Sequence, residues 1–262
     1  DSNTTRGSTL IPSKPVTSLH PLRYFYYRLT VAIISALLLL TAGGIVILST
    51  NSNTKHWFLH QRVSLGYLRQ SLPNSRGNAT NAHAFGFGLY IFICVFELVS
   101  GYLVDYPSVG RVFTANGIGC IISQFATFNF AVSILPVSRN GILSYLFGTS
   151  FERLIVWHRY VSIVAMFSIL AHGVLLWYGK GTEKIWFSSD RYFKSTLGGT
   201  VSCVAMFLMG VSSIYFIRRK LFELFWYSHQ ILFYIAVIGA IIHTKLVLVI
   251  VALPLSLHVL DK

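Results

Sequence analysis

The run LIVWHRYVSIVAMFSILAHGVLLWY, residues 154–178, decides the fold class of this chain. It is 25 residues long with one basic and no acidic side chain, whereas roughly 20 apolar helical residues cross a bilayer core about 30 Å thick. A segment so long and so apolar is typical of a transmembrane helix. Two histidines, His158 and His172, interrupt it, and polar groups inside a membrane are the first candidates for function.

Other apolar runs surround this one and predict a polytopic protein. The expected spans are residues 29–50, 84–104, 115–137, 154–178, 197–217 and 224–244, with a shorter apolar tail at 246–260. We therefore expect an all-α transmembrane helical bundle of about six to seven spans.

The composition excludes most other classes of protein. Hydrophobic residues make up 54% of the 262 residues and charged residues 11%, where ordinary globular domains carry about 25% charged residues. The apolar content argues against disorder, and three cysteines, all within expected spans, argue against a disulfide scaffold. The net charge of +13 lies between apolar runs, so lipid headgroups and cofactor carboxylates are the expected partners and nucleic acid is not.

The chain divides by composition into three parts. Residues 1–28 form a polar N-terminal segment, 29–110 hold the first spans and a basic loop at 51–83, and 111–262 form the core. The positive-inside rule places that loop in the cytoplasm. Its His56 and His60 are spaced for an interfacial helix or, as the alternative, a metal site. A second basic group, which we expect in an outer loop and which would attract anions, contains Lys180, Lys184, Arg191 and Lys194.

Four histidines share one spacing on two expected spans. His158 and His172 lie on the fourth span, His229 and His243 on the sixth, and both gaps are 14 residues. Fourteen residues make almost four helical turns, so the two imidazoles of a helix share a face about 21 Å apart. The two spans are separated by one crossing and run parallel. The first histidines then lie at one membrane depth and the second at another.

Two imidazoles facing each other at two depths are the arrangement that haem iron requires of its axial ligands. We therefore predict two haems b between spans four and six, with the four histidines as iron ligands. Ala165 and Ala236 lie midway between the histidines of their helices and would leave room for the macrocycles. Arg159, Arg218 and Arg219 either contact haem propionates or mark the headgroup zone. His258 lies near the end of the last run, and the sequence assigns it no role.

These residues carry a family resemblance. The motifs around Trp157-His158-Arg159 and Ala171-His172-Gly173, and the string RRKLFELFWYSH at 218–229 followed by His243, resemble the ferric reductase-like transmembrane family. This family includes plant ferric-chelate reductases, fungal metalloreductases and NADPH oxidases. The resemblance implies electron flow from cytosolic NADPH through FAD to an inner haem at His158 and His229, then to an outer haem at His172 and His243. The family often has glycine four residues after the first ligand, where this chain has Ser162.

The chain has no glycine-rich nucleotide-binding fingerprint, so we expect the flavin and nucleotide domain after residue 262 or on a partner. The favoured function is the membrane domain of an NAD(P)H-dependent ferric-chelate reductase, catalytic with that domain and delivering electrons to a ferric chelate. The alternatives are a superoxide-producing NADPH oxidase, with dioxygen as acceptor, and a stand-alone haem protein fed by a separate reductase or built into a larger electron-transfer complex. The plasma membrane is the expected location, with an organelle membrane as the alternative.

Overall fold

The chain is helical throughout the part that the computed structural model describes, residues 21–48, 81–109, 114–137, 150–180 and 196–260. The expected basic loop and its histidines, and the four cations of the second basic group, fall outside the residues or side chains so described. The helices are α1 (Pro21–Leu48), α4 (Asn81–Val109), α5 (Ala115–Ile134), the short 3-10 helix η1 (Leu135–Val137), α7 (Phe151–Lys180), α9 (Thr196–Ser212), α10 (Tyr215–Lys220), α11 (Phe222–His243) and α12 (Lys245–Leu260). The predicted all-α class is confirmed.

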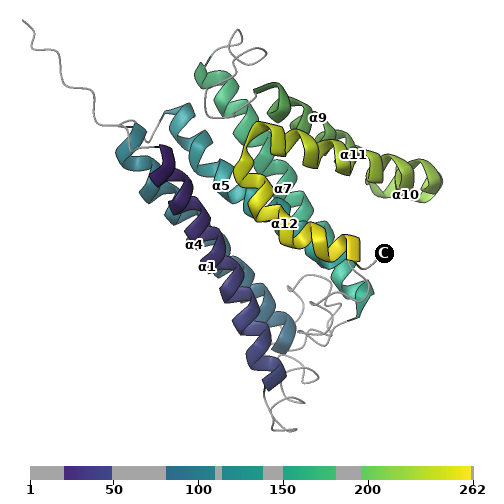
Figure 1. Ribbon diagram of the computed structural model, residues 1–262. Helices are drawn as coiled ribbons and strands as arrows, with labels where there is room; N and C mark the ends of the chain where they lie inside the picture. The colour runs from purple at the N-terminus through teal and green to yellow at the C-terminus, as the bar shows by residue number, and fades with distance from the viewer. Residues whose placement is uncertain (1–20, 49–80, 110–113, 138–149, 181–195, 261–262) are drawn as a thin grey trace, which may run out of the picture.

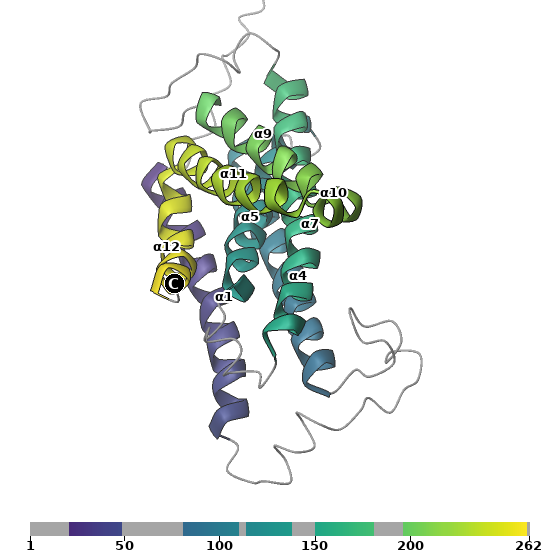
Figure 2. The ribbon, with the colours of Figure 1, turned by 90° about the vertical axis from the view of Figure 1, so that its right-hand side faces the viewer.

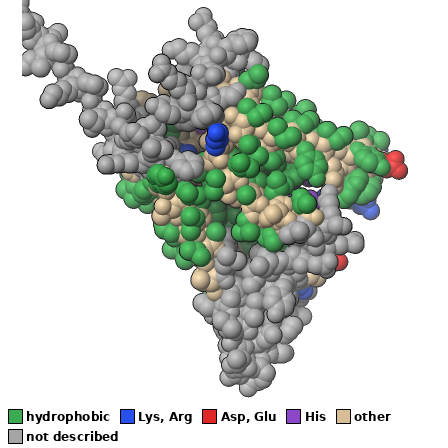
Figure 3. Space-filling model, in the orientation of Figure 1, with side chains coloured by type: hydrophobic (Ala, Val, Ile, Leu, Met, Phe, Trp, Pro, Cys, Tyr) green, Lys and Arg blue, Asp and Glu red, His purple; other side chains and the backbone are tan. Residues whose placement is uncertain are grey.

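Within these ranges, four helical segments are long and apolar enough to cross a membrane: Ala84–Leu103, Ala115–Val137, Phe151–Gly179 and Phe222–His243. Three further apolar helices are shorter, at Tyr26–Leu38, Thr196–Ser212 and Lys245–Val259. The described part of the face in Figure 3 is covered mainly by hydrophobic side chains. An outward-facing surface of this kind fits lipid. By the length and apolar composition of its helices, the chain is an integral membrane protein. The count of six to seven spans stays a prediction.

Two helix boundaries differ from expectation. Helix α1 begins at Pro21, eight residues earlier than the expected span, so Arg28 lies inside it. The expected fifth span, 197–217, is interrupted after Ser212, and α10 begins at Tyr215. The hydroxyl groups of Ser212 and Ser213 both donate to the carbonyl oxygen of Met209, at 2.9 and 2.7 Å. Serine side chains that bind the backbone in this way compete with the helical ladder, which explains the break.

The helices form two groups joined through α5. Helix α5 packs against both α4 and α7, and α1 contacts α4 (Figures 1 and 2). Helices α9 and α11 pack together and cross the others obliquely, while α12 returns along α5 (Figure 1). The central core contains Phe130, Ala131, Ile134, Ala165, Ala205, Met206, Ala236, Val237, Val247 and Val251.

Small residues set the closest helix contacts in this core. Ala165 and Ala236, the midpoints between the histidines of their helices, are both fully buried. Gly239 of α11 lies against Gly198 of α9, and a Cβ atom added to Gly239 would come within 2.8 Å of the Gly198 carbonyl oxygen. Glycine at both positions therefore allows the two backbones to approach, as small residues do between membrane helices.

Candidate functional site

The four histidines lie in two facing pairs between α7 and α11. The ring centres of His158 and His229 are 6.3 Å apart, with an angle of 71° between the ring planes. His172 and His243 have the same separation, 6.3 Å, and an angle of 63°. The structure thus brings together the pairs that the 14-residue spacing predicts.

Helix α5 orients both histidines of α7. The Nδ1 atom of His158 lies 2.7 Å from the carbonyl oxygen of Ser133, and Nδ1 of His172 lies 2.8 Å from the carbonyl oxygen of Gly119. A carbonyl oxygen only accepts hydrogen bonds, so Nδ1 is the protonated nitrogen in each ring. The lone pair of each imidazole is then on Nε2. This is the form in which metal-binding histidines are held by their surroundings.

The histidines of α11 take their orientation from α9 and the turn after it. Nδ1 of His229 lies 3.2 Å from the hydroxyl oxygen of Ser213. Because the Ser213 hydroxyl donates its proton to Met209, its oxygen accepts from His229. His243 packs against Gly199, where an added Cβ would lie 2.8 Å from Nδ1.

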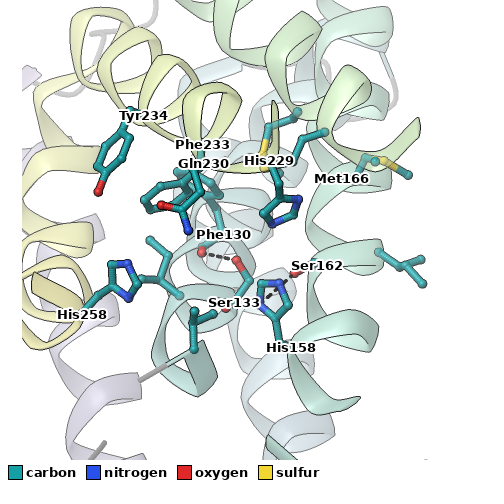
Figure 4. A pocket seen from close by; sticks show the side chains of 16 residues that line it. Phe130, Ser133, His158, Ser162, Met166, His229, Gln230, Phe233, Tyr234 and His258 are labelled. Atoms are coloured by element: carbon teal, nitrogen blue, oxygen red, sulfur yellow. Dashed lines mark hydrogen bonds between the residues drawn. The ribbon is translucent and has the colours of Figure 1, made fainter. Parts of the chain in front are cut away.

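A pocket opens beside His158 and His229 (Figure 4). Its cavity volume is about 170 Å³, below the roughly 300–1,000 Å³ of typical small-molecule sites. Most of its wall is apolar. The lining residues are Phe130, Ser133, Ile134, Val137, His158, Ser162, Ile163, Met166, Met206, Met209, Gly210, His229, Gln230, Phe233, Tyr234 and His258.

One end of this pocket is polar. Gln230 and Tyr234 of α11 and His258 of α12 line it on the side away from α7 (Figure 4). The ring of His258 lies edge-on to Phe233, with the ring centres 6.2 Å apart. Carboxylate groups of a ligand would meet hydrogen-bonding side chains at this end and apolar ones elsewhere. The sequence had placed His258 only near the end of the last span.

The three arginines considered as propionate contacts do not line this pocket. Arg159 and Arg219 are exposed, Arg218 is half-buried, and none of them is among the residues that line the pocket. The guanidinium carbon of Arg219 lies 5.6 Å from the centre of the Tyr215 ring. Exposed basic and aromatic side chains near a helix end are typical of the headgroup zone, the other of the two roles expected for these arginines.

Sequence reasoning missed the residues that hold the imidazoles, namely Gly119, Ser133, Gly199 and Ser213. Two of them act through backbone carbonyl groups, which no residue type reveals. Ser162, where the family often has glycine, lies near the first pair, its hydroxyl oxygen 3.4 Å from Nδ1 of His158. Among the described residues, no group of three or more histidine, cysteine or acidic side chains is gathered around one point, so each candidate metal site has two protein ligands.

Residues 122–240 match the family model described as the ferric reductase like transmembrane component, which confirms the resemblance. Three of the four histidines lie within the matched segment, and His243 lies just beyond it. No solved structure shows a significant match to the chain.

Several curated proteins are similar to this chain. It is 25% identical over 243 residues to ferric reduction oxidase 7, chloroplastic, of Arabidopsis thaliana, covering 89% of this chain and 32% of that protein. It is 30% identical over 138 residues to a superoxide-generating NADPH oxidase heavy chain of Dictyostelium discoideum, covering 43% and 26%. It is 31% identical over 120 residues to a probable ferric reductase transmembrane component of Candida albicans, covering 45% and 18%. The chain therefore spans at most about a third of the length of these relatives, all of which are named as oxidoreductases or their components.

Proposed function

We propose that this chain carries electrons across a membrane through two haems b, as the membrane part of an NAD(P)H-dependent ferric-chelate reductase. One haem would be held by His158 and His229, and the other by His172 and His243. The observation that carries the proposal is the 6.3 Å separation of the ring centres in both pairs.

That separation fits two imidazoles on one metal ion. A bond from a metal to an imidazole nitrogen is about 2 Å long, and the ring centre lies about 1 Å further on. Two axial imidazoles therefore place their centres a little over 6 Å apart. Because the ring planes can rotate about the common axis, the angles of 71° and 63° are compatible with this coordination.

The hydrogen bonds of the site support the same assignment. Oxygen atoms of Ser133, Gly119 and Ser213 accept hydrogen bonds from the Nδ1 atoms of three of the histidines. This holds the Nε2 lone pairs toward the space between the helices and keeps the imidazoles from rotating. A haem with two imidazole ligands has a six-coordinate, low-spin iron that gains and loses one electron, which suits electron transfer rather than oxygen chemistry at the metal.

The lining of the pocket beside the first pair suits part of a macrocycle with carboxylate substituents. Its apolar wall, with Phe130, Met206 and Phe233, would exclude water from a bound macrocycle. Gln230, Tyr234 and His258 would bind the propionates at the polar end. These three residues take the place first considered for the arginines.

The pair at His158 and His229 would be the inner site and the pair at His172 and His243 the outer one. Electrons would come from FAD and NADPH on a flavin dehydrogenase domain or a separate reductase, and a ferric chelate would be the outer acceptor. The plasma membrane is the proposed location, and an organelle membrane is the alternative. The similarity to a superoxide-generating oxidase favours a second candidate, in which dioxygen is the acceptor.

Haem stoichiometry tests the proposal. The pyridine haemochrome assay on the purified chain should give two haems b per polypeptide, and His172→Ala should reduce the value to one. His258→Ala is the matched control, because it removes a histidine from the pocket but no axial ligand, and the value should stay at two. A wild-type chain with one haem or none would exclude the proposal.

The acceptor is tested separately, in membranes that contain the chain with its flavin domain or partner. Reduction of a ferric chelate that superoxide dismutase does not inhibit indicates a ferric-chelate reductase. Reduction that superoxide dismutase abolishes indicates the oxidase.

A further inference from the structure

A second group of buried polar side chains lies away from the histidine pairs, where α1, α4 and α5 meet. Glu97 of α4 is 1% exposed, and Ser35 of α1 is completely buried. The Ser35 hydroxyl donates to Oε1 of Glu97 at 2.7 Å, and the Nε2 group of Gln124 on α5 donates to Oε2 at 2.9 Å. An acidic side chain inside a membrane is costly to keep, which makes it a candidate for a functional role.

The amide of Gln124 provides a second, independent observation. The side chain is 5% exposed, and its Nε2 group also donates to the hydroxyl oxygen of Ser100 at 3.2 Å. Its Oε1 atom, on the same amide group, is buried with no hydrogen-bond donor among the described residues. Buried acceptors in native proteins nearly always have a donor, so this atom indicates a small donor that reaches the cluster.

The chemistry of the cluster favours a proton over a metal cation. Arg28 of α1 is buried beside it and donates to the Ser123 hydroxyl at 3.0 Å and to the Cys120 carbonyl oxygen at 3.1 Å. Its permanent positive charge repels a divalent metal ion more strongly than a single proton. The Ser35 hydroxyl can donate to a carboxylate or accept from a carboxylic acid without moving, so both states of Glu97 have a partner.

Few other ionisable groups face Glu97. Among the described side chains of α1, α4 and α5, Arg28 is the one other charged group. Two weaker acids, Tyr90 and Cys94, precede Glu97 on α4, and the Tyr90 hydroxyl donates to Oδ1 of Asn129 at 2.5 Å. On α5 the thiol of Cys120 is the one titratable group in the described part. Protonation of the cluster therefore takes place on Glu97.

We propose that Glu97 is a proton-binding site in the membrane interior, which takes up one proton from the aqueous phase when an electron enters a haem held by one of the histidine pairs. The carboxylate becomes a carboxylic acid, no other bond is made or broken, and the electron is the one supplied under the proposed function, on which this coupling rests. The positive charge of the proton compensates the negative charge that the electron brings into the membrane.

The position of the cluster suits this coupling. Gln124 lies five residues after Gly119, which contacts His172, and nine before Ser133, which contacts His158. At 1.5 Å per residue it stands about 7 Å and about 14 Å along α5 from these two points, on the α4 side of the helix. A unit charge at about 14 Å, the larger of these two separations along α5, changes the proton affinity of a carboxylate by close to tenfold at an effective dielectric constant of about 20.

Infrared difference spectroscopy on the haem-loaded full chain in lipid nanodiscs tests the proposal. A pH jump should produce the carbonyl band of a protonated carboxyl group, shifted in deuterated water. The band should disappear in Glu97→Gln and persist in Glu152→Gln, a matched change at an exposed glutamate. Chemical reduction should raise the pH at which the band is half-formed by about one unit.

Two results would overturn the proposal. Wild-type and Glu97→Gln pH-difference spectra that are identical would mean that Glu97 keeps one protonation state throughout. A titrating Glu97 band that reduction does not move would exclude the coupling. Ser35→Ala, which should shift the band without removing it, replaces Glu97→Gln if that variant does not fold. The pH-jump band needs no haem, so a chain without haem would contradict the proposed function and leave this site standing.

Discussion

The carbonyl oxygen of Gly119 accepts a hydrogen bond from Nδ1 of His172 at 2.8 Å. The same contact recurs between Ser133 and His158 at 2.7 Å. Helix α5, which has no histidine of its own, therefore fixes the orientation of both imidazoles of α7. Since the acceptors belong to the backbone, the side chains at positions 119 and 133 make neither contact themselves.

Gly199 provides a selective test of the second histidine pair. In Gly199→Ala the added Cβ would lie 2.8 Å from Nδ1 of His243, a distance at which the imidazole must move. We expect the haem content to fall from two to about one, with one low-spin signal lost from the electron paramagnetic resonance spectrum. Gly173→Ala is the matched control, because its Cβ would lie 3.5 Å from the Cys203 sulfur, an ordinary contact. Two intact low-spin signals in Gly199→Ala would contradict the prediction.

Ser213 tests the hydrogen bonds that hold the ligands. Ser213→Ala removes the acceptor for Nδ1 of His229, and loss of such a partner typically weakens metal binding about 10- to 100-fold. Haem titration of the stripped protein should show this loss at one site and normal affinity at the other.

Ser162→Ala is the control for Ser213→Ala. In the wild type, the Ser162 hydroxyl lies 3.4 Å from Nδ1 of His158, and this nitrogen already donates to the carbonyl oxygen of Ser133 at 2.7 Å. We expect its haem affinity to be close to that of the wild type. Equal affinity losses in the two variants would mean that Ser213 has no specific role.

His258 tests the polar end of the pocket. Replacing it with leucine removes a hydrogen-bond donor from the proposed propionate site and leaves the axial ligands in place. The negative charge of the propionate then stabilises the ferric state more strongly, so the midpoint potential of one haem should fall. A hydrogen bond of about 0.5–1.5 kcal/mol corresponds to about 20–60 mV for one electron. Spectroelectrochemical titration should find the other haem unchanged, and two unchanged potentials would remove His258 from the site.

The fold and the pairing of the histidines could be predicted from local patterns. Apolar runs of about 20 residues set the helices, and four of the described helical segments meet the requirements for crossing a membrane. A predicted helix boundary was wrong at Ser212 and Ser213, where side chains bind the backbone. Hydropathy does not detect the competition between such side chains and the helical hydrogen bonds.

The sequence by itself predicted which histidines pair, because a helix rises by a fixed amount per residue and equal gaps on two facing helices bring the side chains into register. Only the tertiary structure decided which groups fix those imidazoles and where Glu97 lies. The contacts of Gly119, Ser133 and Ser213, and the meeting of Glu97 with Ser35 and Gln124, depend on how each helix is rotated about its axis and how closely it approaches its neighbours. Those two quantities come from packing between helices distant in the chain, which the pattern within a single helix does not contain.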